Sequence, residues 1–393
     1  MQTHQSSTVG LPMQKARIFN IFPELEHPKF IIRHLSPNWF ASIMGTGIVA
    51  NAGALLPIHI MGIKTFTTYL WIADTFLLFI LSLTTLTQWI MYPSEAKKTF
   101  LDPAIAQFYG APPMAFLTVG TGFMLIGSKV INPHIALDMA FALWTIGATT
   151  GLATAIGIPF LMFSIHNFKP EQTYATWLMP VVPGVVASGA SALLLPHLPT
   201  GQFQLDFLLL NYMLFGSSMV MAAIIIVMLY SRLMYHKLCS SQIVPTLWIV
   251  LGPIGTSIGA INLLANSSKT ILPQVANSLS AIGIFYGLSL WGFGILWLLL
   301  SAIVTFKTAK NHLPFSLTWW AFTFPLGVFT TGTFELALKT NSHLLAYIGV
   351  FLYFGLIGAW AIVATLTAKG TYLGHLFATS PTKIQIQLDQ KQA

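Results

Sequence analysis

The sequence has 393 residues, of which 55% are hydrophobic and only 7% are charged, whereas an ordinary soluble domain carries about 25% charged residues. A soluble fold of this length would need far more polar surface, so the composition excludes one. The formal net charge of +8 does not indicate a nucleic-acid partner, because the basic residues are scattered between apolar runs. The single cysteine, Cys239, excludes an internal disulfide framework and a thiolate cluster for a metal. No metal or other cofactor is expected.

Long apolar runs predict membrane-spanning helices along the chain. The runs at 67–92 and 275–306 exceed the roughly 20 apolar residues that cross a bilayer as a helix. Because lipid offers no water to unpaired backbone groups, such runs must be helical. The apolar windows and the breakers between them predict an all-α polytopic protein with ten spans, at 36–56, 67–92, 103–127, 135–165, 174–196, 206–232, 245–266, 275–306, 315–338 and 343–367.

One domain accounts for nearly the whole chain. The ten spans lie within 34–370, and the loops between them are short, so consecutive helices are expected to pack as antiparallel hairpins. The segments 1–33 and 371–393 are polar extensions. We therefore expect five helical hairpins in a lipid bilayer, with no second folded domain.

The positions of lysine and arginine orient these spans. If the N-terminus is cytoplasmic, ten spans place 14 of the 18 basic residues inside and four outside, which satisfies the positive-inside rule. Both termini are therefore expected in the cytoplasm, and the membrane is expected to be the plasma (inner) membrane. The four residues predicted to lie outside are Lys64, Lys129, Lys269 and Lys339.

Three aspartates, Asp74, Asp138 and Asp206, lie near the predicted outer starts of even-numbered spans. A helix N-terminus favours negative charge, so we expect these residues to stabilise helix starts. The alternative is a proton relay, which intramembrane carboxylates form in pumps and transporters.

Glycine and proline interrupt the odd-numbered spans, whereas the span at 67–92 contains neither. The glycines Gly47, Gly120, Gly184, Gly255 and Gly327 stand 73, 64, 71 and 72 residues apart. Such near-regular spacing indicates a repeated architecture, with five hairpins around an axis. The candidate kink or pore-lining residues are Gly45, Gly47, Pro113, Gly122, Pro183, Gly184, Pro253, Gly255, Pro325 and Gly327.

Interrupted helices in register favour a central pore. Proline removes a backbone hydrogen bond and glycine permits close approach, and irregular backbone at membrane depth is tolerated where it lines a watery cavity. The alternative is that small residues only aid helix packing. No lysine, arginine or histidine lies in the middle of an odd span, so hydroxyl groups are expected to solvate an anion weakly, namely those of Thr46, Thr118, Thr121, Ser188 and Ser257.

Four segments together resemble the tellurite-resistance/dicarboxylate transporter family, which includes yeast malate and sulfite transporters and plant guard-cell slow anion channels. The similarity covers about 34–370, and the first and last segments are the most specific. The segments are Ser36-Pro-Asn-Trp-Phe40 with Met44-Gly-Thr-Gly47, Thr176-Trp-Leu-Met-Pro180 with Val182-Pro183, Leu251-Gly-Pro-Ile-Gly255, and Trp319-Trp-Ala-Phe-Thr-Phe-Pro325.

This resemblance implies ten helices in five hairpins around a pore, a homotrimer with one pore per subunit, and a pore-plugging phenylalanine at the position of Phe324. It implies transport of small anions, and the long tails favour a C4-dicarboxylate such as malate. The alternatives are an efflux channel for sulfite or another inorganic anion, and a proton-coupled dicarboxylate symporter. An enzyme is not expected, because no cluster of His, Asp, Glu or Ser/Lys groups is predicted at mid-membrane depth.

Overall fold

The computed structural model describes residues 29–378, and all of the regular structure within them is helical. This confirms the predicted helical class. The predicted tails at 1–33 and 371–393 fall largely outside the described residues. Within the described range, eight helical segments are long and apolar enough to cross a membrane.

Five long helices form the outside of the molecule. They have 29 to 34 residues, or about 44–51 Å at 1.5 Å per residue, which exceeds the roughly 30 Å hydrocarbon core. In the most apolar 18-residue stretch of each of these helices, only 22–33% is buried inside the protein. Most of their surface is therefore left for lipid. These helices are α3 (Ile63–Met91), α7 (Pro133–Ser164), α9 (Gln202–Tyr235), α11 (Ala276–Ala309) and α13 (His343–Leu373).

Five shorter helices of 12 to 21 residues lie inside. Three of them lie within segments long and apolar enough to cross a membrane, and 72–78% of the most apolar 18-residue stretch of each segment is buried. In α2, every residue except Ala54 is buried. Two of the ten predicted spans, 36–56 and 174–196, contain helices of only 15 and 12 residues. The inner helices are α2 (Phe40–Ala54), α6 (Ala111–Leu125), α8 (Pro183–Leu194), α10 (Leu251–Ile271) and α12 (Phe324–Thr340).

Each inner helix is preceded by a 3₁₀-helix. The five inner α-helices begin 71, 72, 68 and 73 residues apart, which is more regular than the spacing of the glycines. The same local structure therefore recurs five times along the chain. The 3₁₀-helices are η1 (Pro37–Trp39), η2 (Gln107–Gly110), η5 (Ala175–Leu178), η7 (Val244–Val250) and η8 (Leu317–Phe322).

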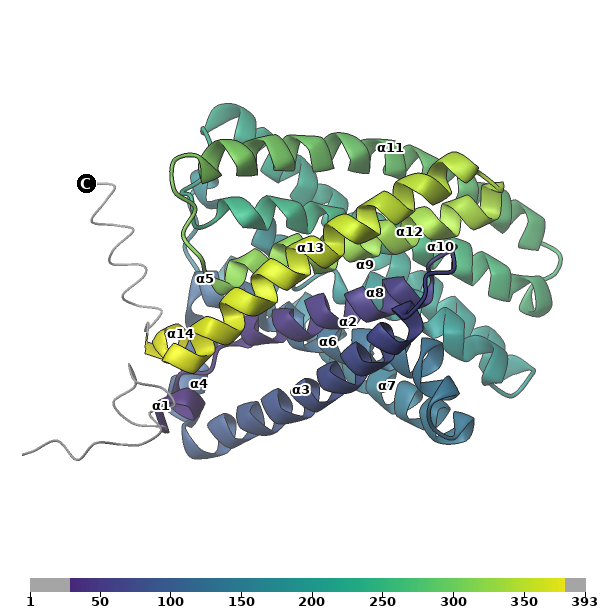
Figure 1. Ribbon diagram of the computed structural model, residues 1–393, viewed down its shortest axis with the longest axis horizontal. Helices are drawn as coiled ribbons and strands as arrows, with labels where there is room; N and C mark the ends of the chain where they lie inside the picture. Colours follow the sequence, from purple (N-terminus) through teal and green to yellow (C-terminus); the bar gives the residue numbers. More distant parts are fainter. Residues whose placement is uncertain (1–28, 379–393) are drawn as a thin grey trace, which may run out of the picture.

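The inner helices pack into a closed ring. In chain order α2 contacts α6, α6 contacts α8, α8 contacts α10, α10 contacts α12, and α12 returns to α2. Each inner helix also contacts the outer helix that follows it in sequence. In Figure 1, α3, α11 and α13 run along the length of the molecule on its outside. The ring is therefore surrounded by long helices, and its axis follows their general direction.

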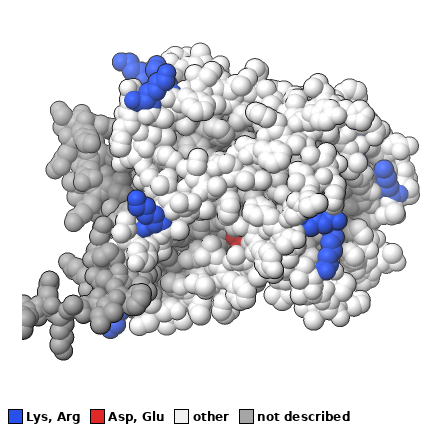
Figure 2. All heavy atoms as spheres, in the orientation of Figure 1, with Lys and Arg blue, Asp and Glu red and all other residues white. Residues whose placement is uncertain are grey.

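Basic side chains are absent from the middle of the face in view. Figure 2 shows lysine and arginine toward the two ends of the long helices, with a broad band between them that holds no basic side chain and a single visible patch of acidic atoms. Such a band is what a hydrocarbon layer requires, because charged side chains are costly within it.

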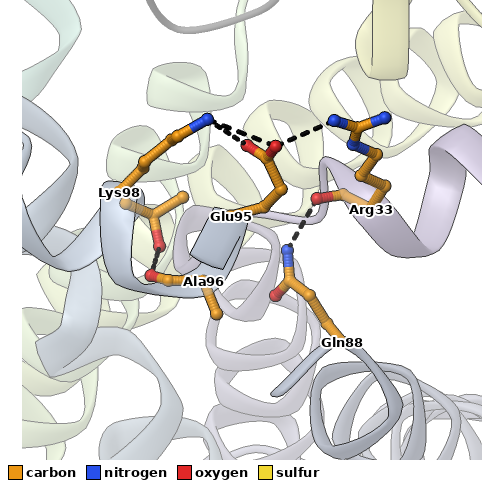
Figure 3. Close-up of polar contacts among 6 residues, drawn as sticks. Arg33, Gln88, Glu95, Ala96 and Lys98 are labelled. Atoms are coloured by element: carbon orange, nitrogen blue, oxygen red, sulfur yellow. Dashed lines mark hydrogen bonds and ion pairs between the residues drawn. The ribbon is translucent and has the colours of Figure 1, made fainter. Parts of the chain in front are cut away.

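A polar network joins the short helices at one end of the ring, where α1 (Lys29–Arg33) and α4 (Pro93–Leu101) meet the end of α3. Glu95 accepts from Arg33 Nη2 at 2.9 Å and from Lys98 Nζ at 3.2 Å. Gln88 Nε2 of α3 donates to the backbone oxygens of Arg33 and Leu35, at 3.1 and 2.8 Å (Figure 3). The hydrogen bond from Arg33 is the largest cause that lowers the pKa of Glu95 from its ordinary value.

The expected role of Asp74 is wrong. Helix α3 begins at Ile63, four residues before the predicted start, so Asp74 lies in the helix interior, about 16 Å from its beginning. Its side chain is 1% exposed, and neither carboxyl oxygen has a hydrogen-bond partner among the described residues. Asp138 and Asp206 are exposed in the second turns of α7 and α9, closer to the predicted positions.

Candidate functional site at the starts of the inner helices

The five inner helices begin around one cavity. Each of them, or the turn before it, contributes to the wall, through Met44, Met114, Met179, Pro253 and Phe324 among others. The cavity offers about 30 Å³ to the centres of water-sized spheres, and one water needs roughly 10–15 Å³ of such space. The cavity is therefore small, and it lies where the inner helices begin.

The wall of this cavity is almost wholly apolar. Thr246 and Thr318 are the hydroxyl-bearing residues among those that line it. Their hydroxyl groups donate to backbone oxygens, Thr246 to Ile243 at 2.6 Å and Thr318 to Gln242 at 3.0 Å. An apolar wall of this kind offers an ion little to replace its water shell.

The prolines predicted to kink the odd spans lie in the first turns of inner α-helices. Pro183 is the first residue of α8 and Pro325 is the second of α12, while Pro113 and Pro253 are the third residues of α6 and α10. In a first turn the missing N–H costs no intrahelical hydrogen bond. Each proline therefore lies near the point where a 3₁₀ turn passes into an α-helix.

The predicted glycines lie at close contacts between helices. A methyl group on Gly255 would overlap the backbone nitrogen of Phe329 in α12, and one on Gly327 would overlap Ile48 in α2. Among the ten candidates, only Pro253 and Pro325 belong to the cavity wall. The other glycines face neighbouring side chains: Gly45 those of Trp320 and Thr323, Gly47 those of Asp74 and Thr118, Gly122 that of Trp71, and Gly184 that of Ser218.

Phe324 is the first residue of α12 and is 4% exposed, with its ring in the cavity wall. The preceding Thr323 donates to the backbone oxygen of Trp320 at 2.7 Å. Trp320 in turn donates to Thr367 Oγ1 of α13 at 3.1 Å. The backbone before Phe324 is therefore fixed to an outer helix.

None of the described residues that line the cavity is charged. Helices α2, α6 and α8 contain no charged residue, and those of α10 and α12 are Lys269, Glu335 and Lys339, at the far ends of these helices. The start of an α-helix carries a partial positive charge of about half a unit. Five helix starts therefore give the cavity a weak preference for anions without a fixed cation.

The hydroxyl groups predicted to solvate an anion have other neighbours. Thr118, Thr121 and Ser257 donate to their own helices, and Thr46 accepts from Trp360 Nε1 at 3.1 Å. Ser188 Oγ is buried and has no partner among the described residues. None of the five lines the cavity.

Sequence reasoning missed three methionines of the wall. Met44, Met114 and Met179 come from three different inner segments and are each less than 7% exposed. Each adjoins a glycine or proline of its odd span in sequence. Their position next to a helix-breaking residue could have identified these methionines as candidates for the cavity wall.

The chain matches one family profile and several transport proteins. The sequence profile of the family described as voltage-dependent anion channel matches residues 34–368. A sulfite efflux pump of Arthroderma benhamiae is 29% identical over 353 residues, covering 88% of this chain and 93% of its own. A transporter of Methanocaldococcus jannaschii is 31% identical over 350 residues, covering 88% of this chain and 96% of its own. A malic acid transport protein of Schizosaccharomyces pombe is 20% identical over 354 residues, covering 88% and 80%.

The profile match covers both the ring of inner helices and the surrounding long helices. It extends over the four sequence segments that carry the resemblance described above. The chain therefore belongs to the voltage-dependent anion channel family, which includes the tellurite-resistance/dicarboxylate transporters, and is a multi-pass membrane protein of an anion-transporting family.

Proposed function

We propose that this protein carries small anions across a membrane through the centre of the inner ring. In this proposal all ten helices span the bilayer as five hairpins, and the 3₁₀ segments before α2 and α8 complete these two short spans. The convergence of five helix starts on one charge-free cavity carries the proposal. Helix dipoles favour an anion there, and the lack of a fixed cation lets it leave again.

The proposed gate is Phe324 together with the methionines beside it. The ring of Phe324 and the side chains of Met44, Met114 and Met179 narrow the same cavity. Removal of the phenyl ring would widen the constriction and admit water. The backbone of α12 would keep its place because Trp320 and Thr367 hold the preceding turn.

Malate and sulfite are the two candidate substrates. Relatives named for sulfite efflux and for malic acid transport both align with 88% of this chain. The cavity is small and has no cationic side chain to pair with two carboxylates. These two features favour sulfite or a similar inorganic anion, although the sequence features favoured malate.

The proposed topology places both termini in the cytoplasm of a cell bounded by the plasma (inner) membrane, with the cavity on that side. The charge asymmetry supports this orientation. Cysteines introduced at Lys97 and at Lys269, in a Cys239→Ser background, test it. An impermeant thiol reagent added to intact cells should label only the second. A homotrimer is part of the same proposal, and cross-linking in membranes tests it.

Anion flux in proteoliposomes tests the function and the gate together. Sulfite, malate and nitrate are compared, with wild-type protein and with Phe324→Ala. We expect sulfite flux above that of empty liposomes and several-fold faster flux in the variant. Phe285→Ala, which changes an exposed ring on α11, is the matched control. Unchanged flux together with a lower Tm for Phe324→Ala would show that Phe324 only packs, and absence of flux for every anion would contradict the proposed function.

A further inference from the structure

A polar cluster is buried between α3 and the inner helices α2 and α6. Asp74, Asn51 and Trp71 are 1%, 3% and 4% exposed. Both oxygens of Asp74, Oδ1 of Asn51 and Nε1 of Trp71 have no hydrogen-bond partner among the described residues. Four unsatisfied polar atoms in one interface are unusual, because buried polar groups are nearly always paired.

Two glycines make room for this cluster. Asp74 Oδ2 lies against Gly47 of α2, and Trp71 Nε1 with Asn51 Oδ1 lies beside Gly122 of α6. Asp74 and Trp71 are one turn apart on α3, as Gly47 and Asn51 are on α2. The two helices are consecutive and joined by a short loop, so they run antiparallel, and Asp74 lies level with Gly47 while Trp71 lies level with Asn51.

The other outer helices show that Trp71 is exceptional. Each of them uses at least one aromatic side chain to bond with the next inner helix: Trp144 to the Ala187 oxygen at 2.8 Å, Tyr212 to Ser268 at 3.2 Å, Trp291 to Thr333 at 3.0 Å and Trp360 to Thr46 at 3.1 Å. Trp71 of α3 faces α6 in the corresponding way, yet its N–H has no such partner within the described chain. Its donor is therefore available to the cluster.

The unsatisfied atoms match a neutral carboxyl group. Asn51 Nδ2 already donates to the Thr118 backbone oxygen at 3.0 Å, which leaves the acceptor Oδ1 to the cluster. Trp71 supplies one donor. A protonated carboxyl group offers one O–H donor and one acceptor oxygen, so it complements both, whereas a carboxylate would face Asn51 Oδ1 with like partial charge. An ionised carboxylate buried without a cation is also very costly.

Within residues 29–378, no cationic side chain hydrogen-bonds to the carboxyl group of Asp74. Helices α2 and α6 contain no titratable residue. The titratable residues of α1 and α4, including Lys29, Arg33 and Glu95, lie near the C-terminal end of α3, away from Asp74. Tyr353 of α13 directs its hydroxyl to the Val49 backbone oxygen at 3.4 Å.

We propose that Asp74, with Asn51 and Trp71, forms a buried proton-binding site in the wall of the inner ring. The neutral carboxyl group of Asp74 donates to Asn51 and accepts from Trp71, directly or through one water. Deprotonation places a negative charge on Asp74, beside Gly47 of α2. Gly47 is three residues from Met44, which lines the cavity. A unit charge about 10 Å from a passing monovalent anion lowers the population of that anion roughly tenfold at an effective dielectric constant of ~20. This consequence rests on the proposed function, and the proton site itself does not.

Infrared spectroscopy of the protein in liposomes at pH 7 tests the site directly. The carbonyl stretch of a protonated carboxyl group should appear in the wild-type-minus-Asp74→Asn difference spectrum, where all other carboxyl groups cancel. Asp138→Asn, which changes an exposed aspartate on α7, should leave the band intact. Trp71→Phe, which keeps a ring but removes the donor, should shift the band to higher frequency. A difference spectrum without the band, or a band unmoved by Trp71→Phe, overturns the assignment.

Flux measurements separate this inference from the function. The anion that passes in the flux panel is measured from pH 6 to 9 at constant concentration of its transported ionic form. Wild-type flux should fall about tenfold once Asp74 loses its proton, and Asp74→Asn, which stays neutral, should remain fast and flat. A carboxyl band without any anion flux would contradict the proposed function alone. Flux with the same pH profile in wild type and Asp74→Asn would contradict the effect of the site on transport.

Discussion

The inner and outer helices cross the same apolar layer in different ways. The outer helices are long, continuous and exposed to lipid on most of their surface. The inner helices are short, begin after 3₁₀ turns and are buried on nearly all sides. Both sets are apolar in sequence, so hydrophobicity does not distinguish them. Length and burial do, because the inner α-helices are shorter and face neighbouring helices instead of lipid.

The largest expected effect comes from filling a glycine of the inner ring. A methyl group at Gly255 overlaps the backbone of Phe329, which cannot move as a flexible side chain can. We expect Gly255→Ala to destabilise the protein by about 3 kcal/mol, measured as a lower Tm in detergent and loss of the monodisperse species.

The matched change on an outer helix is Gly292→Ala. Nothing lies within 4 Å of the position that the new methyl group would occupy on α11. Alanine is the better helix former by about 1 kcal/mol, so we expect an unchanged or slightly higher Tm. Equal losses for the two variants would remove the distinction between inner and outer helices.

A smaller effect is expected where an outer helix is fastened to the ring. Trp144 Nε1 of α7 donates to the Ala187 oxygen of α8 at 2.8 Å. Trp144→Phe keeps an aromatic ring and removes this bond, so a loss of about 1 kcal/mol is expected. Trp89→Phe on the lipid-facing surface of α3, where the indole is 37% exposed, is the control. Thermal unfolding of both variants makes the comparison, and a neutral Trp144→Phe would show that packing alone holds α7 in place.

The smallest effect concerns the network at the end of the ring. The pKa of Glu95 is lowered first by the hydrogen bond from Arg33. Its contribution to stability is therefore present above the ordinary carboxyl pKa of about 4.3 and is lost as the pH falls below that value through the lowered pKa of the folded state. Because this site is near the surface, we expect less than about 1 kcal/mol.

Glu95→Gln tests this contribution through the pH dependence of the Tm between pH 3 and 7. The variant should be slightly less stable than wild type at pH 7 and equal to it at pH 3. A difference that persists unchanged at pH 3 would show that the charge of Glu95 is not the cause.

The sequence by itself determined the helical class, the approximate positions of the long outer helices and the division into odd and even spans. These properties follow from the length of apolar runs and from the placement of glycine and proline, which are local features. The motifs around Met44 and Phe324 also indicated the family. Phe324, Pro253 and Pro325 were named from sequence, and they share one cavity.

Only the tertiary structure decided which residues meet. The methionines of the cavity wall come from segments about 70 residues apart, and no local pattern brings Met44 and Met114 together. Gly47 and Gly122 look like kink residues in sequence, yet they make room for Asp74 and Trp71 of α3. From the sequence, Asp74 was expected near a helix start. Its burial depends on where α3 begins and on which helices cover it, and neither can be read from the sequence. Contacts between distant segments are set by packing, and packing is a property of the assembled ring.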